Sequence, residues 1–300
     1  MRVLVTGSSG LIGGTLVPFL SASGHRVSRL VRRPPTEPDE IGWDPVAGTV
    51  DLRALEGFDA VVHLAGAGIA SGRWTVERKA SIRRSRIEGT RLLAASLDRL
   101  DRRPRVLVAA SAIGYYGNRG DEPLDEGALP GHGFLAELAR DWEAAAASAS
   151  SSGIRVVLVR TGIVLSPRGG ALAKMLLPFR LGLGGPIGDG KAWWSWIALD
   201  DLVAIYHLAI TDEGLDRAVN AVAPTPVTNA EFSRILSLVL GRPALFRVPP
   251  VALRWAFGEM ADEALLASAR VVPVRLGQAG YRFRFPELAA ALRHLLQPAP

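Results

Sequence analysis

Residues 1–15 read MRVLVTGSSGLIGGT, and this stretch decides the fold. A short apolar run at residues 3–5 leads into Gly7, Gly10 and Gly13, and a helical pattern follows directly. A strand, a glycine turn and a helix in this order are typical of the first βα unit of a dinucleotide-binding fold. Glycine permits the sharp turn and lets a pyrophosphate approach the backbone. The start of the helix then offers unpaired N–H groups to that anion.

The composition excludes several classes of function. The 300 residues are 48% hydrophobic and include no cysteine, which excludes disulfides and thiolate catalysis and makes a reducing cytoplasm the expected location. No stretch approaches the ~20 apolar residues of a membrane span, and we expect no membrane partner. The net charge is +6, and the densest basic run, residues 78–91, is interpreted as a solvated helix face. That run lacks stacking aromatic residues, so we expect no nucleic-acid partner.

Strands and helices alternate through the first half of the chain. The expected strands are residues 26–31, 60–64, 106–110, 154–160 and 219–222, and the expected helices are residues 11–19, 75–97, 134–147 and 202–210. Uninterrupted apolar strands between helices indicate a parallel sheet covered on both faces. The sequence therefore predicts a Rossmann-like, doubly wound α/β fold. Asp200 and Asp201, just before the last helix, are expected to cap it and to anchor the neighbouring lobe.

The texture of the sequence changes after residue 161, where glycine, tryptophan and proline become frequent. We expect a dinucleotide-binding domain made of residues 1–163 and about 198–223. A smaller C-terminal substrate lobe, made of about 164–197 and 224–300, is expected to close over the ligand. Within this lobe, Lys191 is a candidate for holding a substrate phosphate, or else a solvated turn lysine. Trp194 is a candidate for stacking on a flat substrate, or else part of the lobe's core.

The end of the second strand favours NADP(H) over NAD(H). In this fold an acidic residue there accepts from the ribose 2′-hydroxyl of NAD, whereas an arginine suits the 2′-phosphate of NADP. Here the chain continues with Arg32 and Arg33 and has no carboxylate at that place. Both guanidinium groups could form charge-assisted bonds to the phosphate. The alternative is two solvated loop arginines in an arginine-rich chain.

Several motifs in a fixed order resemble one known family. They are TGSSGLIG (6–13), HLAGAGI (63–69), SAIGYYG (111–117), GDGKAWWSWIALDD (188–201) and the tail around residues 280–283. The sequence resembles the extended short-chain dehydrogenase/reductases, and within them an atypical epimerase-family group with a short C-terminal extension. The resemblance implies a Rossmann fold with a seven-stranded parallel sheet, NADP binding, and kinship to nucleotide-sugar epimerases and dehydratases.

The resemblance also assigns cofactor-binding residues. The phosphate loop it implies consists of Gly7, Ser8, Gly10, Leu11, Ile12 and Gly13. It places Arg32, with Arg33 beside it, at the ribose phosphate. It places Ala65 and Gly66 at the adenine-ribose side and Ser111 near the nicotinamide.

The usual acid/base pair of these enzymes is missing. They carry a tyrosine with a lysine four residues later on one helix, where the ammonium lowers the phenol pKa. None of the four tyrosines has a lysine at that spacing, and Phe134 or Leu135 stands in the tyrosine's place. Tyr115 or Tyr116 could act instead, with Ser111 orienting the substrate oxygen and Arg119 lowering a phenol pKa. The alternative for Tyr116 is a packed aromatic residue that fixes its loop.

Three functions therefore remain open. The first is an NADP(H)-dependent oxidoreductase or epimerase that acts on a small or nucleotide-linked carbonyl or sugar and has a relocated acid/base group. The second is a sensor that binds NADP(H) without turnover. The third is a partner-binding module that kept the fold. His63 lies inside an apolar strand and is expected to be a core residue, and no spacing suggests a metal site. The sequence carries no signal for an oligomeric state.

Overall fold

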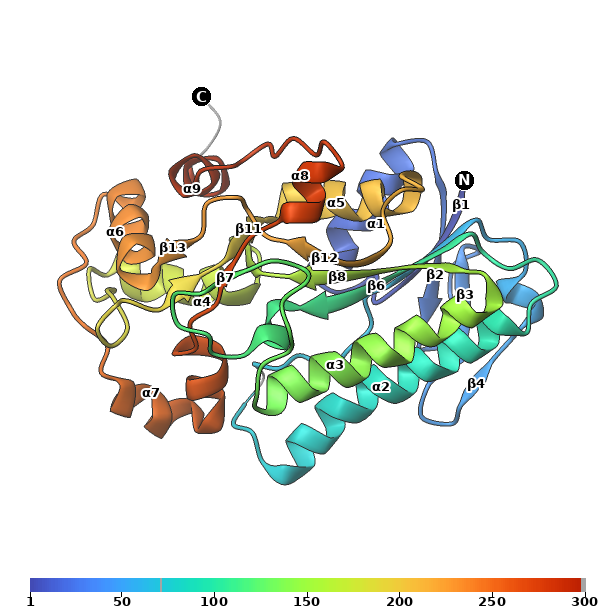
Figure 1. Ribbon diagram of the computed structural model, residues 1–300, viewed down its shortest axis with the longest axis horizontal. Helices are drawn as coiled ribbons and strands as arrows, with labels where there is room; N and C mark the ends of the chain where they lie inside the picture. Colours follow the sequence, from blue (N-terminus) through green and yellow to red (C-terminus); the bar gives the residue numbers. More distant parts are fainter. Residues whose placement is uncertain (71, 298–300) are drawn as a thin grey trace.

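The computed structural model describes residues 1–70 and 72–297. Its centre is an eight-stranded sheet with helices on both faces and a smaller lobe at one end (Figure 1). In spatial order the strands are β12 (Arg217–Ala221), β8 (Arg155–Thr161), β6 (Val106–Ala112), β5 (Ala60–His63), β1 (Arg2–Thr6), β2 (Arg26–Val31), β3 (Glu40–Asp44) and β4 (Thr49–Val50). Seven strands are parallel, and β4 pairs antiparallel with β3. The predicted doubly wound fold is confirmed, with β4 as an eighth strand beyond the seven expected.

Strands β3 and β4 were not predicted from the sequence. The segment Glu40–Asp44 reads EIGWD, which has no apolar run, and β4 has only two residues. These strands lie at one edge of the sheet. There the neighbouring strand, rather than the pattern of apolar residues within the segment, decides whether a segment pairs as a strand. Glu40 and Trp43 are nevertheless buried there.

Alternate residues of the central strand pack into the two layers that flank the sheet. Val3 and Val5 face one layer and Leu4 faces the other, as the two-residue period of a strand requires. The first layer contains α1 (Gly13–Ala22) and α5 (Leu199–Thr211), and the second contains α2 (Val76–Asp98) and α3 (Phe134–Ala147). Figure 1 shows the long helices α2 and α3 side by side. All three strand residues are fully buried, so the glycine turn after them starts from a rigid support.

The helix boundaries follow local capping. Helix α2 begins at Val76 because the Thr75 hydroxyl accepts a hydrogen bond from the Arg78 N–H. Helix α5 begins at Leu199 without a side-chain cap, so the predicted capping by Asp200 and Asp201 is wrong. The anchoring role of Asp201 is correct. Its buried carboxylate accepts from the backbone N–H groups of residues 284 and 285, at 2.8 and 2.9 Å.

The C-terminal lobe has its own apolar core. Its helices are α4 (Gly170–Arg180), α6 (Asn229–Leu240), α7 (Pro250–Phe257) and α9 (Leu288–Leu296). Short two-stranded ladders pair β9 (Ile163–Leu165) with β11 (Trp196–Ala198), β10 (Trp193–Trp194) with β13 (Val227–Thr228), and β7 (Pro123–Leu124) with β14 (Arg270–Val271). Helix α8 (Val274–Gln278) packs back against β12. Within the described residues, no helix is both long and apolar enough to cross a bilayer.

Candidate functional site

The glycine turn between β1 and α1 has no room for side chains at its two key positions. Gly7 has φ +67°, and a Cβ on it would lie 2.8 Å from the carbonyl carbon of Leu64. A Cβ on Gly13 would lie 2.7 Å from the Cα of Ser8. Helix α1 starts after Ile12 with no side-chain hydrogen bond to its first turn. The free N–H groups of this turn and the helix dipole make a site for an anion.

A buried polar chain holds the predicted Ala65–Gly66 segment beside this turn. The Thr6 hydroxyl accepts from the backbone N–H groups of Leu64 and Ala65, both at 3.1 Å, and bonds to His63 Nδ1 at 2.8 Å. His63 Nε2 bonds to Thr90 on α2 at 2.9 Å. Burial lowers the pKa of His63 to about 4, so the ring is neutral at pH 7. His63 is thus a core residue that links two strands and a helix.

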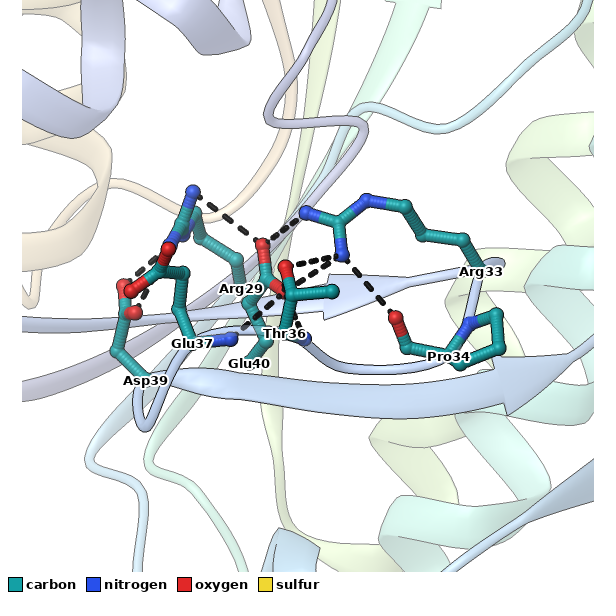
Figure 2. A network of polar contacts seen from close by, with 7 residues as sticks. All are labelled: Arg29, Arg33, Pro34, Thr36, Glu37, Asp39 and Glu40. Atoms are coloured by element: carbon teal, nitrogen blue, oxygen red, sulfur yellow. Dashed lines mark hydrogen bonds and ion pairs between the residues drawn. The ribbon is translucent and has the colours of Figure 1, made fainter.

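The two adjacent arginines after β2 have different surroundings. The Arg33 guanidinium donates to both oxygens of Glu40, at 2.8 and 2.5 Å. Figure 2 shows this carboxylate also receiving the N–H of Thr36, at 2.9 Å, with Arg29 on its other side. The bonds from Thr36 and Arg33 lower the pKa of Glu40 to about 2, so it stays charged. Arg33, predicted to bind the cofactor, is therefore occupied by a protein partner.

Arg32 is exposed and forms no ion pair among the described residues. It lines an open cavity of about 380 Å³ beside β3 and β4, together with Trp43 and Asp51. The cavity lies where the adenosine end of a dinucleotide would extend beyond β2. Of the two arginines, Arg32 is thus the one whose charge remains available to a ligand.

A further cation at this end of the site was missed by the sequence analysis. Arg86 on α2 donates to the Ala67 carbonyl oxygen at 2.9 Å, and its guanidinium lies 5.0 Å from the centre of the Trp142 ring. Burial lowers its pKa to about 10, and no carboxylate in the described part of the chain pairs with it. The interpretation of the basic run as a solvated face is wrong for Arg86. It follows the buried Ile82 by four residues and so shares the inner face of α2.

The polar residues at the end of β6 are bonded to one another. Ser111, only 4% exposed, donates to Glu143 on α3 at 2.6 Å. Arg160 on β8 holds both oxygens of that carboxylate at 2.8 Å and donates to the Tyr116 hydroxyl at 2.9 Å. Tyr116 in turn donates to Asn220 on β12 at 2.7 Å. Four elements of the sheet and its covering layer are joined by this buried network.

This network corrects the catalytic assignment of Tyr116. The side chain is fully buried and burial raises the pKa of its phenol to about 12, opposite to what an acid/base group near neutral pH needs. Arg119 does not lower it, because its guanidinium is paired with Glu122 at 2.7 Å. Tyr115 remains a candidate. It is half-buried, its ring lies 3.5 Å below the Arg160 guanidinium, and its hydroxyl has no hydrogen-bond partner among the described residues.

The place of the missing tyrosine is apolar in three dimensions. Leu135, in the first turn of α3, packs against Gly114 next to Tyr115, with its Cβ 3.2 Å from the position of a Cβ on that glycine. The N–H groups of Phe134 and Leu135 donate to Glu263, both at 2.8 Å. The first turn of α3 is therefore fixed by the lobe and carries no proton donor in this place.

The two candidates for substrate contacts differ. Trp194 is buried, and its ring centroid lies 5.2 Å from that of Phe232 in the lobe core, which corrects its assignment as a stacking platform for a ligand. Lys191 is exposed in a turn closed by a bond from its own N–H to Asp189, at 3.0 Å. Its side chain stays available to a ligand.

Two family models match the chain. The first, described as the NAD dependent epimerase/dehydratase family, matches residues 3–221, and the second, a domain of unknown function, matches residues 248–295. An epimerase family protein of Mycobacterium bovis is 46% identical over 290 residues, or 97% of this chain and 96% of that protein. These matches confirm the family resemblance, including its C-terminal extension.

Two solved structures are similar over nearly the whole chain. The crystal structure of human epimerase family protein SDR39U1 (isoform2) with NADPH has a TM-score of 0.92 at 37% identity and covers 100% of both chains. The nucleoside-diphosphate sugar epimerase from Corynebacterium glutamicum has a TM-score of 0.83 at 39% identity, over 99% of this chain and 58% of its own. The overall fold described above, with its sheet and its lobe, therefore recurs in related proteins.

Proposed function

Because the chain belongs to the NAD dependent epimerase/dehydratase family, we propose that it binds NADP(H) along the ends of β1, β2 and β5. The glycine turn and the start of α1 would hold the pyrophosphate, and Arg32 the 2′-phosphate. Ala65 and Gly66 would lie along the adenine-ribose side, with the Arg86 cation behind them. The observation that carries this proposal is the set of anion-binding groups left without acidic partners at this end of the site. The likeness to human SDR39U1, whose structure contains NADPH, supports it.

We infer that the reaction is hydride transfer to or from a small or nucleotide-linked carbonyl or sugar. A bound nicotinamide cofactor supplies the hydride chemistry. Reduction of a carbonyl also requires a proton on its oxygen. The Ser111 proton is directed to Glu143, so Ser111 orients an oxygen by accepting or sharing a bond. The unbonded hydroxyl of Tyr115 is the proton donor that this loop offers.

The alternative is a protein that binds NADP(H) without turnover. The observation that favours it is the apolar Leu135 in the place of the acid/base tyrosine, beside a network whose polar groups already satisfy one another. Such a protein would report the NADPH/NADP ratio through its lobe. In either case we infer a cytoplasmic protein, because the absence of cysteine fits a reducing compartment.

Oxidation of NADPH, followed at its absorbance band with panels of small carbonyl compounds and nucleotide sugars, separates the two functions. Turnover supports the oxidoreductase, and tight binding with no turnover on any compound supports the sensor. For an active substrate, Tyr115→Phe should lower kcat by about 100-fold or more, as expected for loss of a general acid. Tyr116→Phe is the matched control and should leave kcat unchanged while lowering stability by about 1 kcal/mol. Equal loss of kcat in both variants would contradict the assignment of Tyr115.

A further inference from the structure

The carboxylate of Glu40 joins the two walls of the cavity that Arg32 lines. One wall is the loop of residues 32–35, and the other is formed by residues 42–44 and 49–51, in and just after β3 and β4. Glu40 is the first residue of β3, and its side chain is fully buried. Figure 2 shows the loop folded back so that Arg33 and Thr36 point at this carboxylate. Glu40 therefore fixes one wall of the cavity relative to the other.

The acceptor sites of the Glu40 carboxylate are filled from within the chain. Arg33 donates to its two oxygens, at 2.8 and 2.5 Å. One of these oxygens also accepts from the backbone N–H of Thr36 at 2.9 Å, from the Thr36 hydroxyl at 3.3 Å and from the N–H of Glu37 at 3.3 Å. A carboxylate has about four lone-pair sites, and these bonds occupy them. Glu40, which pairs with Arg29 of β2 in the sheet, thus has no site left for a ribose 2′-hydroxyl.

The Arg33 side chain is used inside the loop. Besides its bonds to Glu40, it donates to the Pro34 carbonyl oxygen at 3.1 Å and to the Thr36 hydroxyl at 2.8 Å. The two consecutive prolines that follow Arg33 restrict the backbone, because the proline ring fixes φ. Few conformations of the loop therefore remain once Glu40 holds Arg33 and Thr36. The place of the neighbouring Arg32 in the cavity wall depends on this conformation.

Two further carboxylates line the cavity, those of Asp44 and Asp51. Asp44 accepts from the backbone N–H groups two and three residues later, at 2.8 and 3.0 Å. Asp51 accepts from the N–H two residues later, at 3.0 Å. Each carboxylate thus closes its own turn, and in the described part of the chain neither forms an ion pair with Arg32. Because these negative charges repel a phosphate, its binding here depends on how closely Arg32 is held toward it.

We propose that Glu40 is a positioning residue that sets the preference for NADP(H) over NAD(H). By holding Arg33 and Thr36, it keeps Arg32 in the cavity wall, where the 2′-phosphate would bind. Because its own oxygens are saturated, NAD(H) gains no bond to Glu40 in exchange for the missing phosphate. The inference rests on the proposed binding of NADP(H) and names a residue of β3 that acts on the choice of cofactor through Arg32.

The test is calorimetric titration of the full-length protein and its variants with NADPH and with NADH. Glu40→Ala should raise Kd for NADPH about tenfold, as for a weakened charge-assisted bond, and change Kd for NADH less than about twofold. Glu40→Gln keeps an oxygen for the N–H groups of Thr36 and Glu37, so its increase should be smaller, and it decides the test if Glu40→Ala does not fold. Asp39→Ala is the matched control in the same loop. Its half-buried carboxylate pairs with Arg29, so both Kd values should stay unchanged.

A double-mutant cycle determines whether Glu40 acts through Arg32. In the Arg32→Ala protein, Glu40→Ala should cause no further change in the ratio of the two Kd values, because the cation that it positions is gone. A further change there, or an equal loss of affinity for both nucleotides, would overturn the assignment.

The outcomes also separate this inference from the proposed function. If the parent protein binds neither nucleotide, the proposed function fails, and the role of Glu40 fails with it. If the parent protein prefers NADPH and Glu40→Ala keeps that preference, only the role of Glu40 is overturned. Tighter binding of NADPH by Glu40→Ala would overturn it too, because the released Arg33 would then itself be a phosphate ligand.

Discussion

The two ends of the candidate site use polar groups in opposite ways. At the glycine turn, helix α1 starts uncapped, and neither the exposed Arg32 nor the half-buried Arg86 has an acidic partner among the described residues. At the end of β6, Ser111 and Tyr116 are bound into a closed network centred on a buried ion pair. Unsatisfied cations and N–H groups are suited to receive an anionic ligand, whereas satisfied groups give rigidity. The chain therefore presents more groups suited to binding a cofactor than groups suited to catalysing a reaction.

The largest expected effect comes from breaking the network at the β6 end. Glu143→Ala leaves the buried Arg160 without its partner, and the free energy of unfolding should fall by about 3–5 kcal/mol. Urea unfolding measures this loss. Glu137→Ala, exposed on the same helix, should change stability by less than about 0.5 kcal/mol. Similar stabilities of the two variants would show that the network does not hold the sheet and α3 together.

Changes at the other end should lower the affinity for NADPH. Gly13→Ala places a methyl group against the backbone of the turn, so Kd for NADPH should rise about 100-fold, which corresponds to about 2.7 kcal/mol. Gly14→Ala is the neighbouring control, since its Cβ would lie at an ordinary 3.7 Å from the Ser8 carbonyl oxygen. Calorimetric titration compares them. Equal Kd values for NADPH in the two variants would show that the glycine turn is not part of the binding site.

Arg32 and Arg33, which are adjacent in one loop, allow a free cation and a paired cation to be compared directly. Arg32→Ala should weaken NADPH binding about 10- to 100-fold, the range for a lost charge-assisted hydrogen bond, and leave NADH binding unchanged. Arg33→Ala should have a smaller effect on the preference for NADPH, because its guanidinium is held by Glu40. The ratio of NADPH to NADH affinities is the quantity to measure in each variant. A larger change of this ratio in Arg33→Ala would reverse their roles.

A further expected effect, on the pH dependence of stability, concerns His63, which links β1 and β5 to α2. Its pKa of about 4 in the folded protein lies below the ordinary 6.5, so the unfolded chain binds more protons between these values. Its contribution is complete above pH 6.5 and falls by about 1.4 kcal/mol per pH unit as the pH drops toward 4. In unfolding measurements, His63→Gln should reduce this slope, and the exposed His132→Gln should not. Identical slopes for both would mean that His63 does not remain neutral in the fold.

Local pattern made the first βα unit predictable, because the strand, the glycine turn and the helix lie within about twenty residues and each needs its own residue type. The state of Tyr116 was not predictable in this way. Its phenol is fixed by Asn220, which is 104 residues distant, and by Arg160 on another strand. Arg86 was hidden in a basic run, although its spacing from Ile82 would have placed it on the inner face. Contacts between residues that are distant in sequence thus decide which candidate residues stay available to a ligand.

The most direct test of the central claim is a calorimetric titration of the full-length protein with NADPH and with NADH under identical conditions. The account predicts one site that binds NADPH about 10- to 100-fold more tightly than NADH, because only NADPH carries the phosphate that Arg32 would receive. Equal affinities, or no binding of either nucleotide, would contradict it.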